Sequence, residues 1–256
     1  MSSNECGTDM LSDWLSNIQE ENDEYREPTL DKHTLNFLRL TTRSLKQDIR
    51  VFVSAVDILE EYICVKGEAA ISYPTLVAVS SVFIACKCVG DQDLKIQHLQ
   101  SYLQKVTGIV FEYNQVVSCE LDIFSTLRNS VPITNKVDDL TTFVFKFEKD
   151  TRIRAHVMPI CLDIMEMLYL TKKVWFYRFK EIYSINKEAC RVFGKLMKHR
   201  LFLPICILIF VFRNTNYQHC LDVEKILQDM SEKCVIHSDH LNAFIKLIGD
   251  VYSGKM

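Results

Sequence analysis

Glycine and proline are scarce in this 256-residue sequence, with seven and five residues respectively. Folds built of strands and tight turns need these residues at their turns, so the scarcity favours an all-helical protein. Long apolar runs are missing as well, because the longest, Leu201 to Phe212, has twelve residues. A membrane-spanning helix needs about 20. The sequence therefore predicts an all-α protein in which this run is a buried helix and not a membrane span.

No long cluster of basic residues is present. The formal net charge is −3, and no run of five Lys or Arg occurs. Without a basic groove, sequence-specific nucleic-acid binding is not expected, although a local basic patch remains open. The first twenty residues are polar and acidic, unlike a secretory signal. The ten cysteines have no disulfide-like spacing, so most are interpreted as small buried hydrophobes.

Motifs of enzyme chemistry are also missing, since there is no Gly-rich phosphate loop and no Gly-x-Ser-x-Gly elbow. One late group, Cys234, His237 and His240, has a spacing that can bind zinc. We prefer to interpret it as loop and helix-cap residues, because the gap back to Cys220 is unlike that of a compact zinc finger. The sequence thus predicts no enzyme activity, no cofactor and no metal.

The most informative stretch runs from Ser72 to Gly90. Pro74 suits the first turn of a helix with Ser72 as its cap, and Gly90 suits a left-handed stop. Every side of this helix is apolar or small except at Lys87, which predicts a helix buried among others. Lys87 lies in the last turn. It either offsets the helix dipole while extending to water, or marks a surface where a charge is used.

Four amphipathic helices are predicted around this buried one, on the evidence of helical spacing of apolar residues. They cover Leu30 to Leu45, Val51 to Val65, Leu94 to Val106, and Glu112 to Leu127. In the last of them, Glu120 lies within an apolar arc that includes Leu121 and Phe124. A buried carboxylate is costly unless it is paired. Glu120 therefore either lies at the rim with its head in solvent, or meets an opposite charge such as Lys87.

The second half repeats this order of helices without any residue-level repeat. The run Leu203 to Phe212 takes the part of the buried helix. The other helices predicted there cover residues 137–147, 153–170, 175–182, 186–199, 220–231 and 240–252. The chain is thus expected to consist of a polar arm (residues 1–27), a first helical domain (28–132) and a second (133–256).

Three stretches of the first domain resemble the cyclin box. Phe83 to Lys87 is similar to the third-helix signature, in which small apolar residues lead to a Lys. Cys119 to Leu127 is similar to the fifth-helix signature, and it precedes a turn at Val131 to Thr134. Ala55 to Tyr62 resembles the second helix, with Glu60 in place of an Asp. The resemblance implies a cyclin fold with two five-helix bundles, the second of them divergent.

The resemblance also implies a binding site. In cyclins the matching Lys and Glu hold the regulatory helix of a cyclin-dependent kinase, which assigns kinase binding to Lys87 and Glu120. The supporting cyclin-box positions are Glu60, Phe83, Ala85, Leu121 and Phe124. The resemblance does not extend to the patch by which some cyclins dock substrates. Its positions hold Leu30, Thr34 and Phe37, with Asp31 in place of an Arg.

Two further stretches, Tyr25 to Pro28 and Cys161 to Leu170, are similar to the cyclin N-terminal-domain-containing proteins of meiosis, which mark designated crossover sites. This similarity implies a nuclear, chromosome-associated protein with a cyclin-dependent kinase and meiotic recombination factors as partners. The alternative is a cyclin-fold scaffold that recruits DNA-repair or transcription factors without activating a kinase, as transcription factor IIB shows. Because a scaffold has no evident need for the Lys87 and Glu120 pair, the pair favours the kinase-binding alternative.

Overall fold

The computed structural model describes residues 27–91, 94–128, 131, 135–148, 150–215, 217 and 236–254. Within these residues it contains eleven α-helices, a short 3-10 helix at Glu68–Ala70 and no strand. The helices are α2 (Lys32–Ser44), α3 (Ile49–Lys66), α4 (Pro74–Val89), α5 (Ile96–Thr107), α6 (Tyr113–Thr126), α7 (Lys136–Phe147), α8 (Thr151–Leu170), α9 (Lys172–Ile182), α10 (Lys187–Lys198), α11 (Phe202–Asn214) and α13 (Ser238–Tyr252). The all-helical prediction is confirmed.

The chain forms two compact units. One contains Pro28–Asp139 together with the short segment Tyr169–Lys173, and the other contains the described residues of Leu140–Leu168 and Val174–Met256 together with Glu27. The helix predicted at 220–231, the turn at 132–134 and most of the polar arm lie outside the described residues. The division of the chain at residue 133 stays a prediction.

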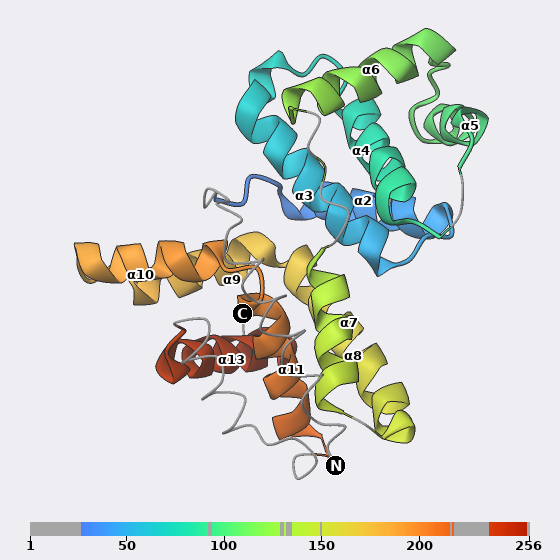
Figure 1. The fold of residues 1–256 in the computed structure, drawn as a ribbon. Helices are drawn as coiled ribbons and strands as arrows, with labels where there is room; N and C mark the ends of the chain where they lie inside the picture. Colours follow the sequence, from blue (N-terminus) through green and yellow to red (C-terminus); the bar gives the residue numbers. More distant parts are fainter. Residues whose placement is uncertain are drawn as a thin grey trace. The chain divides into compact units, whose positions relative to one another are not determined.

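Helix α4 is the centre of the first unit, as predicted. It contacts α2, α3, α5 and α6, which lie around it in Figure 1. Twelve of its 16 residues are buried, including Val79, Phe83 and Ala85. Small side chains such as Ala78, Ser80 and Ala85 allow the neighbouring helices to approach closely. A helix without a polar face is therefore enclosed by its neighbours along most of its length.

The ends of α4 differ from the prediction in their chemistry. The helix begins at Pro74, but its N-cap is Tyr73 and not Ser72, and no side chain caps it. Gly90 has φ −78° and ψ 153°, so it is extended and not left-handed. A Cβ at Gly90 would lie 2.5 Å from the carbonyl oxygen of Cys86 and 2.8 Å from Oε1 of Gln47. Glycine is required there for space and not for its φ angle.

The most buried side of helix α6 differs in part from the one predicted. Val116, Ile123 and Leu127 are buried, whereas Leu121 is 64% exposed. The predicted placement of Leu121 in the apolar arc against the core is therefore wrong. Two adjacent rows of this helix are apolar, and each residue step rotates the side chain by about 100°, so the spacing alone could not choose between the rows. Glu120 lies on the inward row, between Val116 and Ile123.

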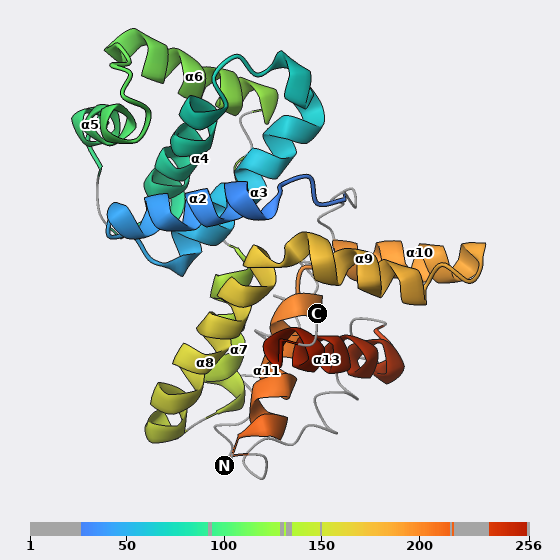
Figure 2. The same ribbon diagram turned by 180° about the vertical axis from the view of Figure 1, so that it is seen from behind.

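In the second unit, α11 is buried along its whole apolar run from Phe202 to Phe212, as predicted. Its neighbour α13 contacts it and lies beside it in Figure 2. Aromatic rings fill the space around these helices: Trp175, Phe176, Phe179, Phe193, Phe202 and Phe244. No helix among the described residues is both long enough and apolar enough to cross a membrane.

Candidate functional site

Lys87 and Glu120 meet in the first unit. The Lys87 Nζ donates to Oε1 of Glu120 at 2.9 Å and to Oε2 at 3.0 Å. The Lys87 side chain is 49% exposed, whereas that of Glu120 is 12% exposed. The two lone charges of α4 and α6 are thus paired across the helices, with the ammonium group accessible to solvent. Of the two alternatives for Glu120, the structure shows the paired one.

The aromatic ring of Phe83 also contacts the ammonium group of this pair. The Nζ of Lys87 lies 4.3 Å from the centre of the Phe83 ring, within the range of a cation–π interaction. Phe83 and Ala85 are both fully buried in α4. The ammonium group is therefore contacted from two sides, by the carboxylate of α6 and by a buried ring of α4.

A second polar contact joins α6 to α3 one half-turn beyond Glu120. The Tyr62 hydroxyl donates to Asp122 Oδ2 and the Lys66 Nζ donates to Oδ1, both at 2.6 Å. These hydrogen bonds, first from Lys66 and then from Tyr62, lower the pKa of the Asp122 carboxyl. Burial raises the pKa of the Tyr62 hydroxyl, and the Asp122 carboxylate raises it further. The end of α6 that carries Glu120 is thus fixed to two other helices.

Apolar side chains lie next to the ion pair on the outward face of α6. Leu121 is 64% exposed and Tyr113 is 56% exposed, while Val117 and Phe124 are half-buried. Val117, Leu121 and Phe124 are four and three residues apart, so they form one row along the helix. We call this row, with Lys87 and Glu120, the α4–α6 face. It combines a fixed ion pair with exposed apolar surface.

Glu60, predicted to support the site, belongs to a different cluster. Its Oε2 accepts from the Lys172 Nζ at 2.5 Å, and the same Nζ lies 3.4 Å from Oδ1 of Asp57. The Tyr169 hydroxyl donates to Oδ2 of Asp57 at 3.1 Å, and Lys136 Nζ lies 3.9 Å from that oxygen. This cluster joins α3 to the segment Tyr169–Lys173 within the first unit.

The charges of this cluster shift one another's pKa values. Burial raises the pKa of the Asp57 carboxyl, but Lys136, Lys172 and the Tyr169 hydroxyl together outweigh burial and hold it below its ordinary value. Burial lowers the pKa of the Lys172 ammonium, but Glu60 and Asp57 outweigh it and raise the pKa. Both shifts favour the charged forms of Asp57 and Lys172, as expected for a network of ion pairs.

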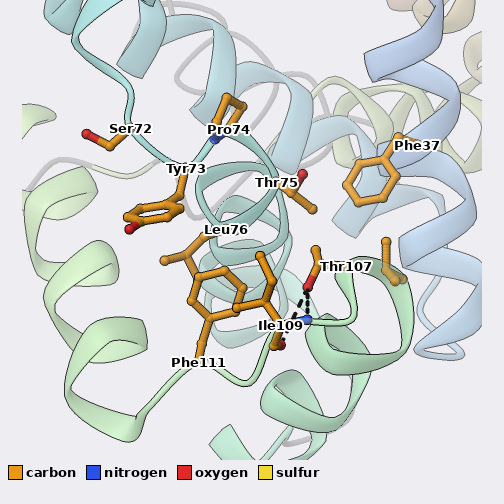
Figure 3. Close-up of a pocket in the computed structure, with 10 residues that line it drawn as sticks. Phe37, Ser72, Tyr73, Pro74, Thr75, Leu76, Thr107, Ile109 and Phe111 are labelled. Carbon is orange, nitrogen blue, oxygen red and sulfur yellow. Dashed lines mark hydrogen bonds between the residues drawn. The ribbon is translucent and has the colours of Figure 1, made fainter.

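A pocket with a volume of about 330 Å³ opens where α4 begins (Figure 3). Phe37 of α2, Tyr73, Leu76 and Phe111 line it, and the rings of Tyr73 and Phe111 meet edge to face at 5.9 Å.

Of the positions that correspond to the cyclin docking patch, Phe37 faces this pocket. Leu30 is buried in the core. Asp31 is the N-cap of α2 and accepts from the backbone N–H of Thr34 at 2.7 Å.

Of the three residues with zinc-like spacing, His237 and His240 lie within the described part of the chain, where no group of three potential ligands occurs. Nδ1 of His240 is hydrogen-bonded to the Tyr183 hydroxyl at 2.7 Å. His237 is the N-cap of α13, which agrees with the helix-cap interpretation. Cys220 and Cys234 lie outside the described residues.

Asp122 and Lys172 belong to these contacts but are absent from the sequence-based prediction. Asp122 holds α6 against α3. The sequence feature that could have identified it is a carboxylate two residues after Glu120, near the end of a helix that must pack against its neighbours. Lys172 holds Glu60, but it lies 112 residues further along the chain and no local pattern points to it.

The sequence and the fold are similar to those of known cyclins. The family model described as "Cyclin, N-terminal domain" matches residues 8–131. The X-ray structure of a viral cyclin from herpesvirus saimiri is similar, with a TM-score of 0.62 and 15% sequence identity over 95% of this chain and 96% of that chain. No curated protein matches the sequence. At 15% identity the structural likeness concerns the fold alone.

Proposed function

The chain has the cyclin fold, and from that premise we propose that it is a regulatory subunit that binds a cyclin-dependent kinase through the α4–α6 face. The observation that carries the proposal is the paired Lys87 and Glu120, fixed between α4 and α6 beside the exposed Leu121. Catalysis belongs to the kinase. The chain supplies a rigid surface that selects one placement of a kinase helix.

The chemistry of the ion pair suits the binding of a helix. An ammonium group has three N–H donors, and two of those of Lys87 reach Glu120, which leaves one for a partner's carbonyl oxygen. The carboxylate has acceptor positions beyond the two that Lys87 occupies. The pair is therefore oriented to receive both kinds of backbone group from a partner helix.

The pair is half exposed at Lys87 and mostly buried at Glu120. Its buried carboxylate is neutralised within the protein, and its exposed ammonium group is open to a partner. At an interface the same pair is shielded from water by the partner. Its neighbour Leu121 then gives the apolar contact that hot spots require.

The proposal is tested by co-purification with candidate cyclin-dependent kinases. The double variant Lys87→Ala/Glu120→Ala is expected to lose at least about 2 kcal/mol of binding free energy, or roughly thirtyfold in affinity. Leu121→Asp is expected to weaken binding without affecting folding, because Leu121 is 64% exposed. The matched control is Glu188→Ala/Arg191→Ala, an exposed ion pair on α10. Circular dichroism checks that each variant is folded.

Undiminished kinase binding by both the double variant and Leu121→Asp would contradict the proposed face. If no cyclin-dependent kinase binds the native chain, the alternative of a scaffold for DNA-repair or transcription factors is favoured.

The resemblance of residues 25–28 and 161–170 to the meiotic cyclin-like proteins supports a role at designated crossover sites on chromosomes in the nucleus. Meiotic recombination factors are the further partners that this role implies. Immunofluorescence on spread meiotic chromosomes tests it. Foci that coincide with crossover markers are expected, and staining confined to the cytoplasm would contradict it.

A further inference from the structure

Positive charge is concentrated in one part of the second unit. Between Val174 and Arg200 there are seven Lys and Arg and two Glu, a formal charge of +5, although the whole chain carries −3. This segment contains most of α9 and the whole of α10. We propose that the outward face of α10 binds the phosphate backbone of duplex DNA without sequence preference, a function separate from kinase binding.

The basic residues of α10 share one face. Lys187, Arg191, Lys195 and Lys198 are all exposed. At 100° per residue they fall within an arc of about 80°. The buried residues of the helix, Phe193 and Leu196, point to the opposite side. We call the four basic residues the α10 stripe.

The apolar side of α10 is already occupied. The ring of Phe193 lies 5.4 Å from that of Phe176, 5.7 Å from that of Phe179 and 5.8 Å from that of Tyr183, measured between ring centres. Helices α9 and α10 lie side by side in both views (Figures 1 and 2). Since the apolar side packs against its own unit, α10 cannot insert it into a bilayer, and its free side offers charge alone. This favours a polyanion in water over a membrane surface.

Helix stability does not account for the whole stripe. Lys195 and Lys198 lie in the last turn, where the helix dipole favours cations. Lys187 is the first residue of the helix, where the dipole disfavours a cation. Arg191 is paired with Glu188 at 3.4 Å, but no ion pair joins Lys187, Lys195 or Lys198 to another residue in the described part of the chain. These three ammonium groups are available to a ligand.

The spacing of the stripe fits a rigid row of phosphates. From Lys187 to Lys198 the helix rises about 16 Å, and over that length a DNA duplex presents roughly ten phosphates on its two strands. The four charges lie three or four residues apart, so they recur about once per turn. Acidic side chains more than about 10 Å from the stripe are largely screened at 0.1 M salt.

The test measures binding of the full chain to a fluorescent 20-base-pair duplex by anisotropy, between 50 and 200 mM KCl. The three ammonium groups, together with Arg191 once it exchanges its exposed contact with Glu188 for a phosphate, make four phosphate contacts. Four contacts predict a slope of log K against log salt of about −3.6, and equal affinity for two unrelated sequences. The variant Lys187→Gln/Lys195→Gln/Lys198→Gln is expected to reduce the magnitude of that slope by about 2.7. The matched control, Lys32→Gln/Lys105→Gln/Lys246→Gln, removes three exposed charges outside the stripe and should leave the slope unchanged.

Two outcomes would overturn the inference. One is that the native chain fails to bind the duplex at 50 mM KCl, and the other is that the stripe variant binds with an unchanged slope. Binding to vesicles that contain 30% phosphatidylserine, without binding to the duplex, would assign the stripe to a lipid surface. Kinase co-purification is expected to be the same for the stripe variant and the native chain, so failure here is distinct from failure of the proposed kinase face.

Discussion

Replacing Lys172 with Met is expected to destabilise the first unit by about 3 kcal/mol. The Lys172 Nζ lies 2.5 Å from Glu60 Oε2 and 3.4 Å from Asp57 Oδ1, and its side chain is 18% exposed. Breaking a buried ion pair by removing one partner costs about 3–5 kcal/mol, because the other charge stays buried without compensation. We expect the lower end of that range, since Asp57 retains Tyr169 and Lys136.

The double variant Lys172→Met/Glu60→Leu separates this explanation from a simple loss of packing. It removes both charges and replaces them with apolar groups of similar size, which is often neutral. We therefore expect it to lie within about 1 kcal/mol of the native chain. The assay is urea denaturation followed by circular dichroism, with free energies of unfolding from the linear dependence on urea. A single variant as stable as the native chain, or a double variant as unstable as the single one, would refute the reasoning.

Further predictions concern the glycines Gly90 and Gly194 and the carboxylate of Asp122. Gly90→Ala should cost about 1–3 kcal/mol, because its Cβ would lie 2.5 Å from the Cys86 carbonyl oxygen. Gly194→Ala, where no atom lies within 4 Å, should instead stabilise α10 by about 0.5–1 kcal/mol, and thermal unfolding compares the two. Because Lys66 and Tyr62 lower the pKa of Asp122, its contribution is present above about pH 4 and is lost as the pH falls through the lowered value. Asp122→Asn should therefore lose less stability than the native chain between pH 5 and pH 3, and equal losses would contradict this assignment.

Local pattern was enough to predict most helices. The bounds of α4 follow from one proline, one glycine and an apolar run between them, and the structure begins and ends the helix at Pro74 and Val89. The pairing of Lys87 with Glu120 was also accessible, because each was the only charge on an otherwise apolar surface. Such a charge needs a partner, and the opposite charge nearby was the obvious candidate.

What the sequence did not reveal depends on tertiary contacts. The inward face of α6 was misjudged at Leu121, because two adjacent apolar rows compete and only the neighbouring helices decide between them. The role of Gly90 was misjudged because the space beside it is filled by Gln47, which belongs to a distant turn. The resemblance to cyclins assigns Glu60 to the kinase face, yet its contact is Lys172, far along the chain.

The segment Tyr169–Lys173 has a consequence for the order in which the protein can fold during synthesis. It groups with Pro28–Asp139, so the first unit includes residues made long after its five helices. Glu60 and Lys172 are 112 residues apart, which a ribosome covers in about 6–22 s. For that interval the nascent chain holds the Glu60 carboxylate without its cation. The first unit is thus completed late in translation, and a fragment that ends at residue 139 lacks part of its own stabilising charge.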